Sequence, residues 1–117
     1  MTVQFEDVDS YQIVHHTKLV AYLERARVQF FRRIGFDITS KMYEMVLYTI
    51  TMTFKKPARF LDNLTVSVKL KSTETFKCTF AYRILRNSDL IAKAETEIAF
   101  VDPETKKIVP LPENFTD

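Results

Sequence analysis

The segment from Glu6 to His16 holds the side chains of this chain that are best suited to proton transfer. It places three carboxylates and two histidines within eleven residues, in the string EDVDSYQIVHH. The segment comes just before a stretch with helical periodicity, and a helix N-terminus offers free backbone N–H groups and a dipole that favours negative charge. Such a segment could hold an oxyanion while a neighbouring carboxylate or histidine moves a proton.

Two structural explanations of the same segment stand beside the catalytic one. Short acidic loops before helices often only complement the helix dipole, and we expect Glu6 and Asp7 to be solvated charges of this kind. Adjacent histidines with nearby acids could also suggest a metal site. Neighbouring side chains in a loop diverge, however, and the chain lacks an H-x-x-x-H spacing, so no metal and no cofactor are expected.

The composition bounds the class of protein. A length of 117 residues with 46% hydrophobic residues predicts one globular domain spanning residues 1–117. The only glycine is Gly35, which argues against glycine-rich phosphate-binding loops. The net charge of +2 comes from dispersed residues, so nucleic-acid binding is not expected. Cys78 is the only cysteine and should be buried in a strand.

No apolar run approaches the roughly 20 residues of a membrane span, and no secretory leader is recognisable. We therefore expect a cytoplasmic protein without a membrane span.

Hydrophobic periodicity predicts one strand, one long helix and then a series of strands. Val3 and Phe5 alternate with polar residues, as in a short strand. Residues 17–34 carry an apolar stripe at steps of three and four, which indicates an amphipathic helix. Gly35 follows the stripe and could take the left-handed conformation that ends a helix. The stripe consists of Leu19, Leu23, Ala26, Phe30 and Ile34.

From residue 46 onwards the period becomes two. Four alternating segments cover residues 46–54, 64–70, 76–84 and 90–100, and a short apolar pair follows at 108–109. In the first, one face of the sheet is expected to carry Val46, Tyr48, Ile50, Met52 and Phe54. The pattern predicts an α+β fold, with one long helix packed on a five- to six-stranded antiparallel sheet. Because one helix covers one face and the sheet edges stay open, a homodimer or homotetramer is expected.

Several strings, in this order along nearly the whole chain, resemble the hotdog-fold acyl-CoA thioesterases of the 4-hydroxybenzoyl-CoA thioesterase type. They are EDVDSYQIVHH, LERAR, KKPARFLDNL, FAYRIL and AFVDPETKKIVPLP. The resemblance is greatest to the bacterial branch associated with the Tol-Pal envelope system. It implies a hotdog fold and hydrolysis of acyl-CoA or acyl-carrier thioesters. It also implies that Asp9 is the catalytic carboxylate and that His16, seven residues later, belongs to the site.

The residues agree with that chemistry. Thioester hydrolysis needs an attacking oxygen, a stabilised oxyanion and a leaving thiolate, and a thiol with a pKa near about 8.5 leaves with little acid help. Asp9 could act as a general base on water or attack directly to form an anhydride, and both routes stay open. His16 could orient the carbonyl or the water, while N–H groups from Ile13 to Thr17 could hold the oxyanion.

The expected substrate-binding residues lie in two places. Tyr11 and Gln12 stand where the family usually has small residues, so with Ile13 they should shape the acyl entrance. Lys55, Lys56 and Arg59 form a basic cluster that could contact the phosphates of CoA or an acyl carrier protein. Two other functions remain open from the sequence: a hotdog dehydratase acting on hydroxyacyl thioesters, and a non-catalytic acyl-thioester binding protein.

Overall fold

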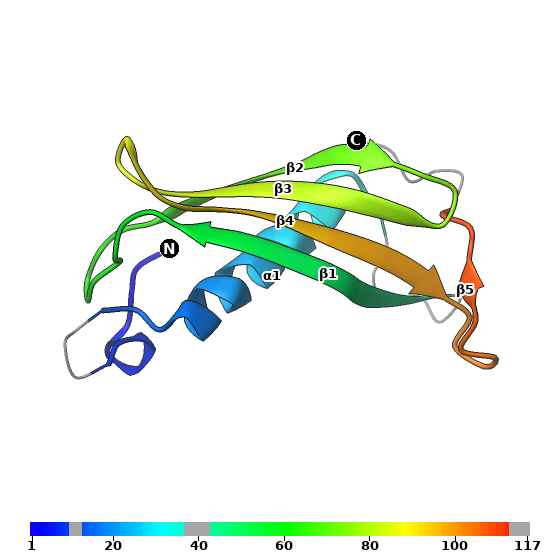
Figure 1. Ribbon diagram of the computed structural model, residues 1–117, viewed down its shortest axis with the longest axis horizontal. Coiled ribbons are helices and arrows are strands. Elements are labelled where there is room, and N and C mark those ends of the chain that lie inside the picture. The colour runs from blue at the N-terminus through cyan, green and yellow to red at the C-terminus, as the bar shows by residue number, and fades with distance from the viewer. Residues whose placement is uncertain (10–12, 37–42, 113–117) are drawn as a thin grey trace.

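The protein consists of one long helix and an antiparallel sheet, seen in a computed structural model that describes residues 1–9, 13–36 and 43–112 (Figure 1). A short 3-10 helix, η1 (Phe5–Asp7), precedes helix α1 (His16–Arg33). Five strands follow: β1 (Glu44–Phe54), β2 (Thr65–Thr73), β3 (Lys77–Arg86), β4 (Asp89–Val101) and β5 (Ile108–Val109). Among the described residues, no helix has both the length and the apolar character needed to cross a bilayer.

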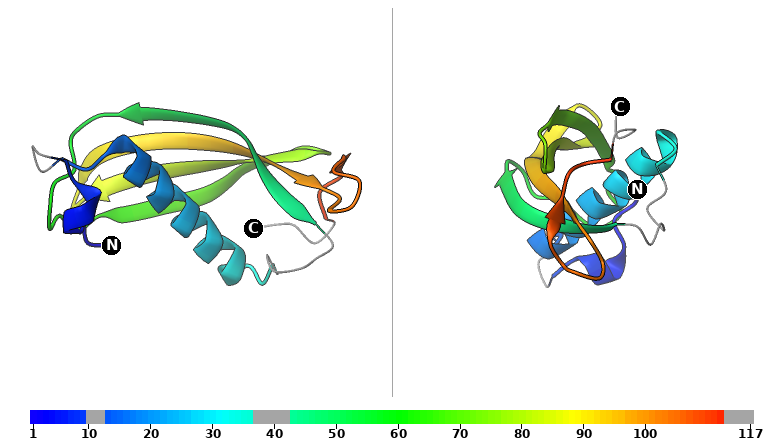
Figure 2. Two further views of the ribbon diagram at one scale, coloured as in Figure 1. Left: turned by 90° about the horizontal axis from the view of Figure 1, so that it is seen from below. Right: turned by 90° about the vertical axis from the view of Figure 1, so that its right-hand side faces the viewer.

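The sheet has the strand order β1-β4-β3-β2, and β5 pairs with the end of β4. All pairings are antiparallel. The helix lies across one face, and the sheet curves around it (Figure 2). This arrangement confirms the predicted α+β fold. The short strand predicted at Val3 and Phe5 is wrong: Phe5 begins η1, and only Thr2 forms a bridge, to Asn63.

Helix α1 confirms the helix predicted for residues 17–34. The predicted stripe faces the sheet, with Ile34 half-buried at its end, and Tyr22 and Phe31 widen it. The helix ends in a Schellman motif, in which Phe36 N–H donates to Phe31 C=O at 2.9 Å and Gly35 N–H donates to Arg32 C=O at 3.2 Å. Gly35 has a φ of 77°, the left-handed conformation expected of it.

The core is largely aromatic and lies between α1 and the central strands β3 and β4. The rings of Phe30 and Phe31 both contact Phe80, with centroids 5.2 and 5.6 Å apart in edge-to-face geometry. Next to Phe80 in the sheet, Tyr82 exchanges a 2.6 Å hydrogen bond with Thr96, so these buried hydroxyl groups are satisfied. Cys78 is buried on the same side of β3, as predicted, and burial raises the pKa of its thiol to about 12.

Strand β1 differs from its prediction because it contains a bulge. The register with β4 shifts between Leu47 and Thr49, so Tyr48 is the extra residue. Val46 lies opposite Ala99, which also pairs with Lys77 on the outer face, whereas Ile50 lies opposite the buried Thr96. Val46 and Ile50 therefore point to opposite faces. The bulge leaves large apolar side chains exposed on both sides of this edge strand.

Candidate active site

The N-terminal loop, the start of α1 and the β1–β2 connection lie together at one end of the molecule (Figures 1 and 2). Backbone hydrogen bonds fix this arrangement. Val14 N–H donates to Ala58 C=O at 2.7 Å, and Ile13 forms a bridge with Arg59. Val14 is itself buried, so the loop is anchored by a side chain as well as by the main chain. Residues far apart in sequence are thereby brought to one site.

Asp7 is buried, and the expectation that it would be a solvated charge is wrong. Its Oδ2 accepts hydrogen bonds from the Tyr22 hydroxyl at 2.8 Å and from Gln4 N–H at 3.1 Å. Burial by itself raises the pKa of Asp7, but these two hydrogen bonds and the positive charges of Lys18 and Arg25 together outweigh it, so the pKa lies below its usual value. Burial and the contact with Asp7 raise the pKa of Tyr22. Asp7 therefore fastens the loop to the inner face of α1.

Asp9 lies two residues further along, half-buried, in the loop that Asp7 fastens. Its N–H donates to the carbonyl of Ile13 at 3.0 Å, and Ile13 N–H lies 3.4 Å from its Oδ1. Asp9 is thus held by its contacts with Ile13, just before α1. Tyr11 and Gln12, which were predicted to shape the acyl entrance, lie outside the described residues.

His16 is the first residue of α1, and its side chain is exposed. Its ring contacts the ring of Phe54 at the end of β1, with centroids 6.3 Å apart and an edge-to-face angle of 74°. His15 is the N-cap residue but makes no side-chain cap hydrogen bond, and the first turn of α1 contains no acidic residue. The positive end of the helix dipole is therefore not offset by an acidic side chain of its own first turn.

A hollow of about 270 Å³ opens beside the start of α1. Its walls come from the loop, the first turn of the helix and the β1–β2 connection. They are formed by Ile13, Val14, His16, Leu19, Phe54, Lys55, Lys56, Pro57 and Ala58. The hollow thus combines an apolar wall with a histidine and two lysines, and Ile13 in this wall contacts Asp9.

The three predicted cations of this region differ in their surroundings. Lys55 and Lys56 both donate their backbone N–H groups to Ile91 C=O, at 2.8 and 3.1 Å, which fixes their places at the rim of the hollow. The Lys56 ammonium also pairs with Asp89 at 3.1 Å. Arg59 is exposed and adjoins the hollow only through its bridge to Ile13.

The structure thus brings six of the predicted site residues to one end of the molecule and adds two that sequence reasoning missed. The six that surround or adjoin the hollow are Asp9, Ile13, His16, Lys55, Lys56 and Arg59. The missed pair is Asp7 and Tyr22. Tyr22 lies three residues after Leu19 on the same helical face, and that spacing could have indicated a buried hydroxyl group in need of a partner.

Comparisons with known proteins agree on one family. The family model described as "Thioesterase-like superfamily" matches residues 3–117. "Acyl-CoA thioester hydrolase YbgC" of Escherichia coli O6:H1 is 31% identical, covering 97% of this chain and 87% of that protein. "Acyl-CoA thioesterase YbgC" of Haemophilus influenzae is 27% identical, covering 94% and 84%. The crystal structure of the hypothetical protein AQ1494 from Aquifex aeolicus aligns with a TM-score of 0.90 at 33% identity, covering 97% and 90%.

Proposed function

Because this chain belongs to the thioesterase-like superfamily, has the hotdog fold and is a thioesterase, we propose that it hydrolyses acyl-CoA thioesters with Asp9 as the catalytic carboxylate. The products are a free acid and coenzyme A. The names of the relatives from Escherichia coli and Haemophilus influenzae support the choice of substrate. The observation that carries the proposal is the contact of Asp9 with Ile13, which lies in the wall of the hollow at the start of α1.

In the proposed mechanism, the Asp9 carboxylate acts either as a general base toward water or as a nucleophile toward the thioester carbonyl. The carbonyl oxygen gains negative charge as the carbon becomes tetrahedral. Backbone N–H groups at the start of α1 stabilise that charge, helped by a helix dipole that no acidic first-turn residue opposes. The bond to sulfur then breaks, and the thiolate leaves with little need of an acid. On the general-base route Asp9 has taken the proton of the attacking water and the free acid is released directly; on the nucleophilic route water hydrolyses the anhydride, which frees the acid and restores Asp9.

The remaining residues position the substrate. His16 lies in the wall of the hollow and orients the carbonyl or the attacking water. Lys55 and Lys56, at the rim, and Arg59, nearby on the surface, attract the phosphates of CoA. The same cations could receive the phosphopantetheine arm and acidic surface of an acyl carrier protein, which is the alternative carrier in this proposal.

The assembly proposed is a homodimer or homotetramer in which β1 pairs with a second copy. β1 is an edge strand, and Ile50 and Phe54 remain 40% and 50% exposed on the helix side of the sheet. The radius of gyration is 15.6 Å, against about 13 Å for a compact domain of this length. A second copy that paired with the open edge at β1 would cover these exposed apolar side chains. Because Phe54 also contacts His16, the second copy would lie beside the hollow.

The experiment that tests this function compares Asp9→Asn with the wild-type protein on a panel of acyl-CoAs, with detection of the released thiol. Asp9→Asn keeps the size of the side chain and removes its charge, so kcat should fall by at least about 10²-fold with the fold unchanged. Glu6→Gln is the matched control, because Glu6 is exposed in the same segment. Its kcat should stay close to that of the wild type.

Two results would contradict the proposal. Full turnover by a folded Asp9→Asn protein would remove Asp9 from the mechanism. Release of no thiol from any acyl-CoA by the wild-type protein would instead favour a dehydratase or a binding protein.

A further inference from the structure

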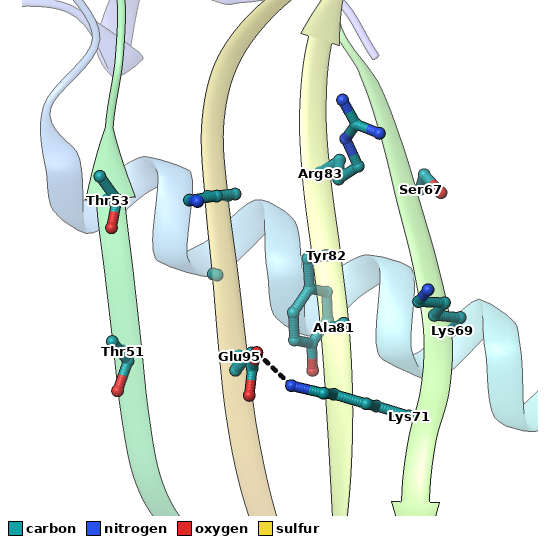
Figure 3. A pocket seen from close by; sticks show the side chains of 11 residues that line it. Thr51, Thr53, Ser67, Lys69, Lys71, Ala81, Tyr82, Arg83 and Glu95 are labelled. Atoms are coloured by element: carbon teal, nitrogen blue, oxygen red, sulfur yellow. Dashed lines mark hydrogen bonds and ion pairs between the residues drawn. The ribbon is translucent and has the colours of Figure 1, made fainter.

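The outer face of the sheet, away from α1, carries a row of four residues, one from each long strand. Thr53 of β1 lies opposite Lys93 of β4, Lys93 lies opposite Arg83 of β3, and Arg83 lies opposite Ser67 of β2. Two cations thus occupy the middle of the row and a hydroxyl group stands at each end. Figure 3 shows this face with α1 behind the strands.

The positive charge of this face is not balanced. The carboxylates nearest the row are already engaged, Glu95 with Lys71 at 2.7 Å and Glu97 with Lys77 at 2.6 Å. Within residues 1–9, 13–36 and 43–112, no carboxylate forms an ion pair with Lys69, Arg83 or Lys93. Like charges directly opposite each other on neighbouring strands are destabilising, so the pairing of Lys93 with Arg83 has a cost in the free protein.

The row lies in the wall of a hollow of about 680 Å³. The middle of the hollow is open because Ala81 presents only a methyl group between Lys69 and Glu95, its neighbours across the sheet. Lys71 reaches over this gap to Glu95 (Figure 3). The volume is typical of sites for small organic ligands, which occupy about 300–1,000 Å³.

We propose that this hollow binds a phosphate-bearing small molecule of the nucleoside diphosphate type. The planar guanidinium of Arg83 can donate two parallel hydrogen bonds to one phosphate, and Lys93 and Lys69 supply point charges on either side. The hydroxyl groups of Ser67 and Thr53 supply further donors at the ends of the row. A bound phosphate would also relieve the repulsion between Lys93 and Arg83.

A second copy of this chain is a poorer occupant of the same face. The hollow on this face is lined by four cations, Lys69, Lys71, Arg83 and Lys93, and by one carboxylate, Glu95. Two such faces would place an excess of positive charge against itself. The hollow opens on the side of the sheet opposite α1, so its occupation does not depend on the proposed hydrolysis.

The test measures binding directly, by calorimetric titration of ADP and of pyrophosphate into the wild-type protein at constant ionic strength. The variant Arg83→Gln/Lys93→Gln should weaken binding at least about tenfold, as expected for loss of charge-assisted hydrogen bonds. The control Arg32→Gln/Lys107→Gln removes the same charge from exposed positions elsewhere and should bind like the wild type. Without ligand, the first variant should unfold at the same or a higher temperature than the wild type, because a repulsive pair is gone.

A second measurement identifies the source of the phosphate group. It compares the KM values of the wild type and the variant for acyl-CoA and for the matching acyl-pantetheine, which lacks the nucleotide. If KM rises for acyl-CoA alone in the Arg83→Gln/Lys93→Gln variant, the ligand is the nucleotide portion of the substrate. If neither KM changes while ADP binding is lost, the ligand is a separate nucleotide. The proposal is overturned if neither ADP nor pyrophosphate binds the wild-type protein. Affinity for ADP and pyrophosphate that is undiminished in the folded Arg83→Gln/Lys93→Gln variant overturns it equally.

Discussion

At the scale of single residues, the contact between Asp7 and Tyr22 links the loop before α1 to the helix. The hydroxyl group and the carboxylate are both buried, so removal of either partner leaves a polar group unsatisfied. Tyr22→Phe and Asp7→Asn should each lower the free energy of unfolding by about 1–3 kcal/mol. Urea denaturation of both single variants and the double variant measures this, and the double should lose less than the sum of the singles.

Glu6→Gln is the control for these three variants. Because Glu6 is exposed, this substitution should change the free energy of unfolding by no more than about 0.5 kcal/mol. Strict additivity of the Asp7 and Tyr22 effects would show that the hydrogen bond does not couple them.

The same contact predicts how stability depends on pH. The pKa of Asp7 in the folded protein lies below its value in the unfolded chain. Its contribution is therefore complete above the unfolded value of about 3.9 and is lost as the pH falls through the lower folded value. The difference in stability between the wild type and Asp7→Asn should shrink as the pH falls below about 4. A difference that stays constant from pH 7 to pH 3 would contradict this assignment.

The sequence could indicate the catalytic candidates but not the structural role of Asp7. The density of acids and histidines pointed to the segment, and Asp9 and His16 remain predictions that activity measurements must test. The prediction for Asp7 was wrong because a carboxylate can be buried only where the fold supplies a hydrogen-bond partner. Here that partner is a tyrosine fifteen residues away. The spacing of Tyr22 on the helix can indicate a buried hydroxyl group, but it does not identify Asp7 as the partner.

At the scale of the elements, the end of α1 offers a clean test of backbone conformation. Gly35 has a φ of 77°, and a Cβ placed there would meet no atom within 4 Å. Gly35→Ala should therefore cost about 1–2 kcal/mol in the free energy of unfolding from the left-handed conformation alone. Gly35→Asn should cost less, because asparagine tolerates this conformation. Equal stability of all three proteins in thermal unfolding would refute the role of the Schellman motif.

Periodicity predicted the elements well where the contrast between the two faces was strong. Helix α1 and strands β2, β3 and β4 appeared as expected because one side of each packs against the core. Strand β1 carries Val46, Leu47 and Tyr48 in succession, and a run of apolar residues has no alternation to reveal a bulge. The change of face at Tyr48 was therefore invisible in the sequence.

At the scale of the whole molecule, the open edge at β1 predicts self-association. Ile50→Lys places a charge in the middle of this apolar edge and should shift the protein toward the monomer in light scattering. Leu61→Lys is the control, since Leu61 is 64% exposed in the β1–β2 connection and adjoins Asp62, which pairs with Arg86 at the end of β3. A wild-type protein that is monomeric and active at assay concentration would exclude a subunit interface from the site.

The burial of Cys78 means that its reaction with a thiol reagent can report when the fold opens. A thiol-reactive dye requires a thiolate, and the only cysteine of the chain is 1% exposed, with a pKa of about 12. The native protein should therefore be silent toward such a dye, and all colour in a turnover assay should come from released product. Because β3 lies inside the sheet, slow labelling of Cys78 without substrate would time the opening of the fold itself.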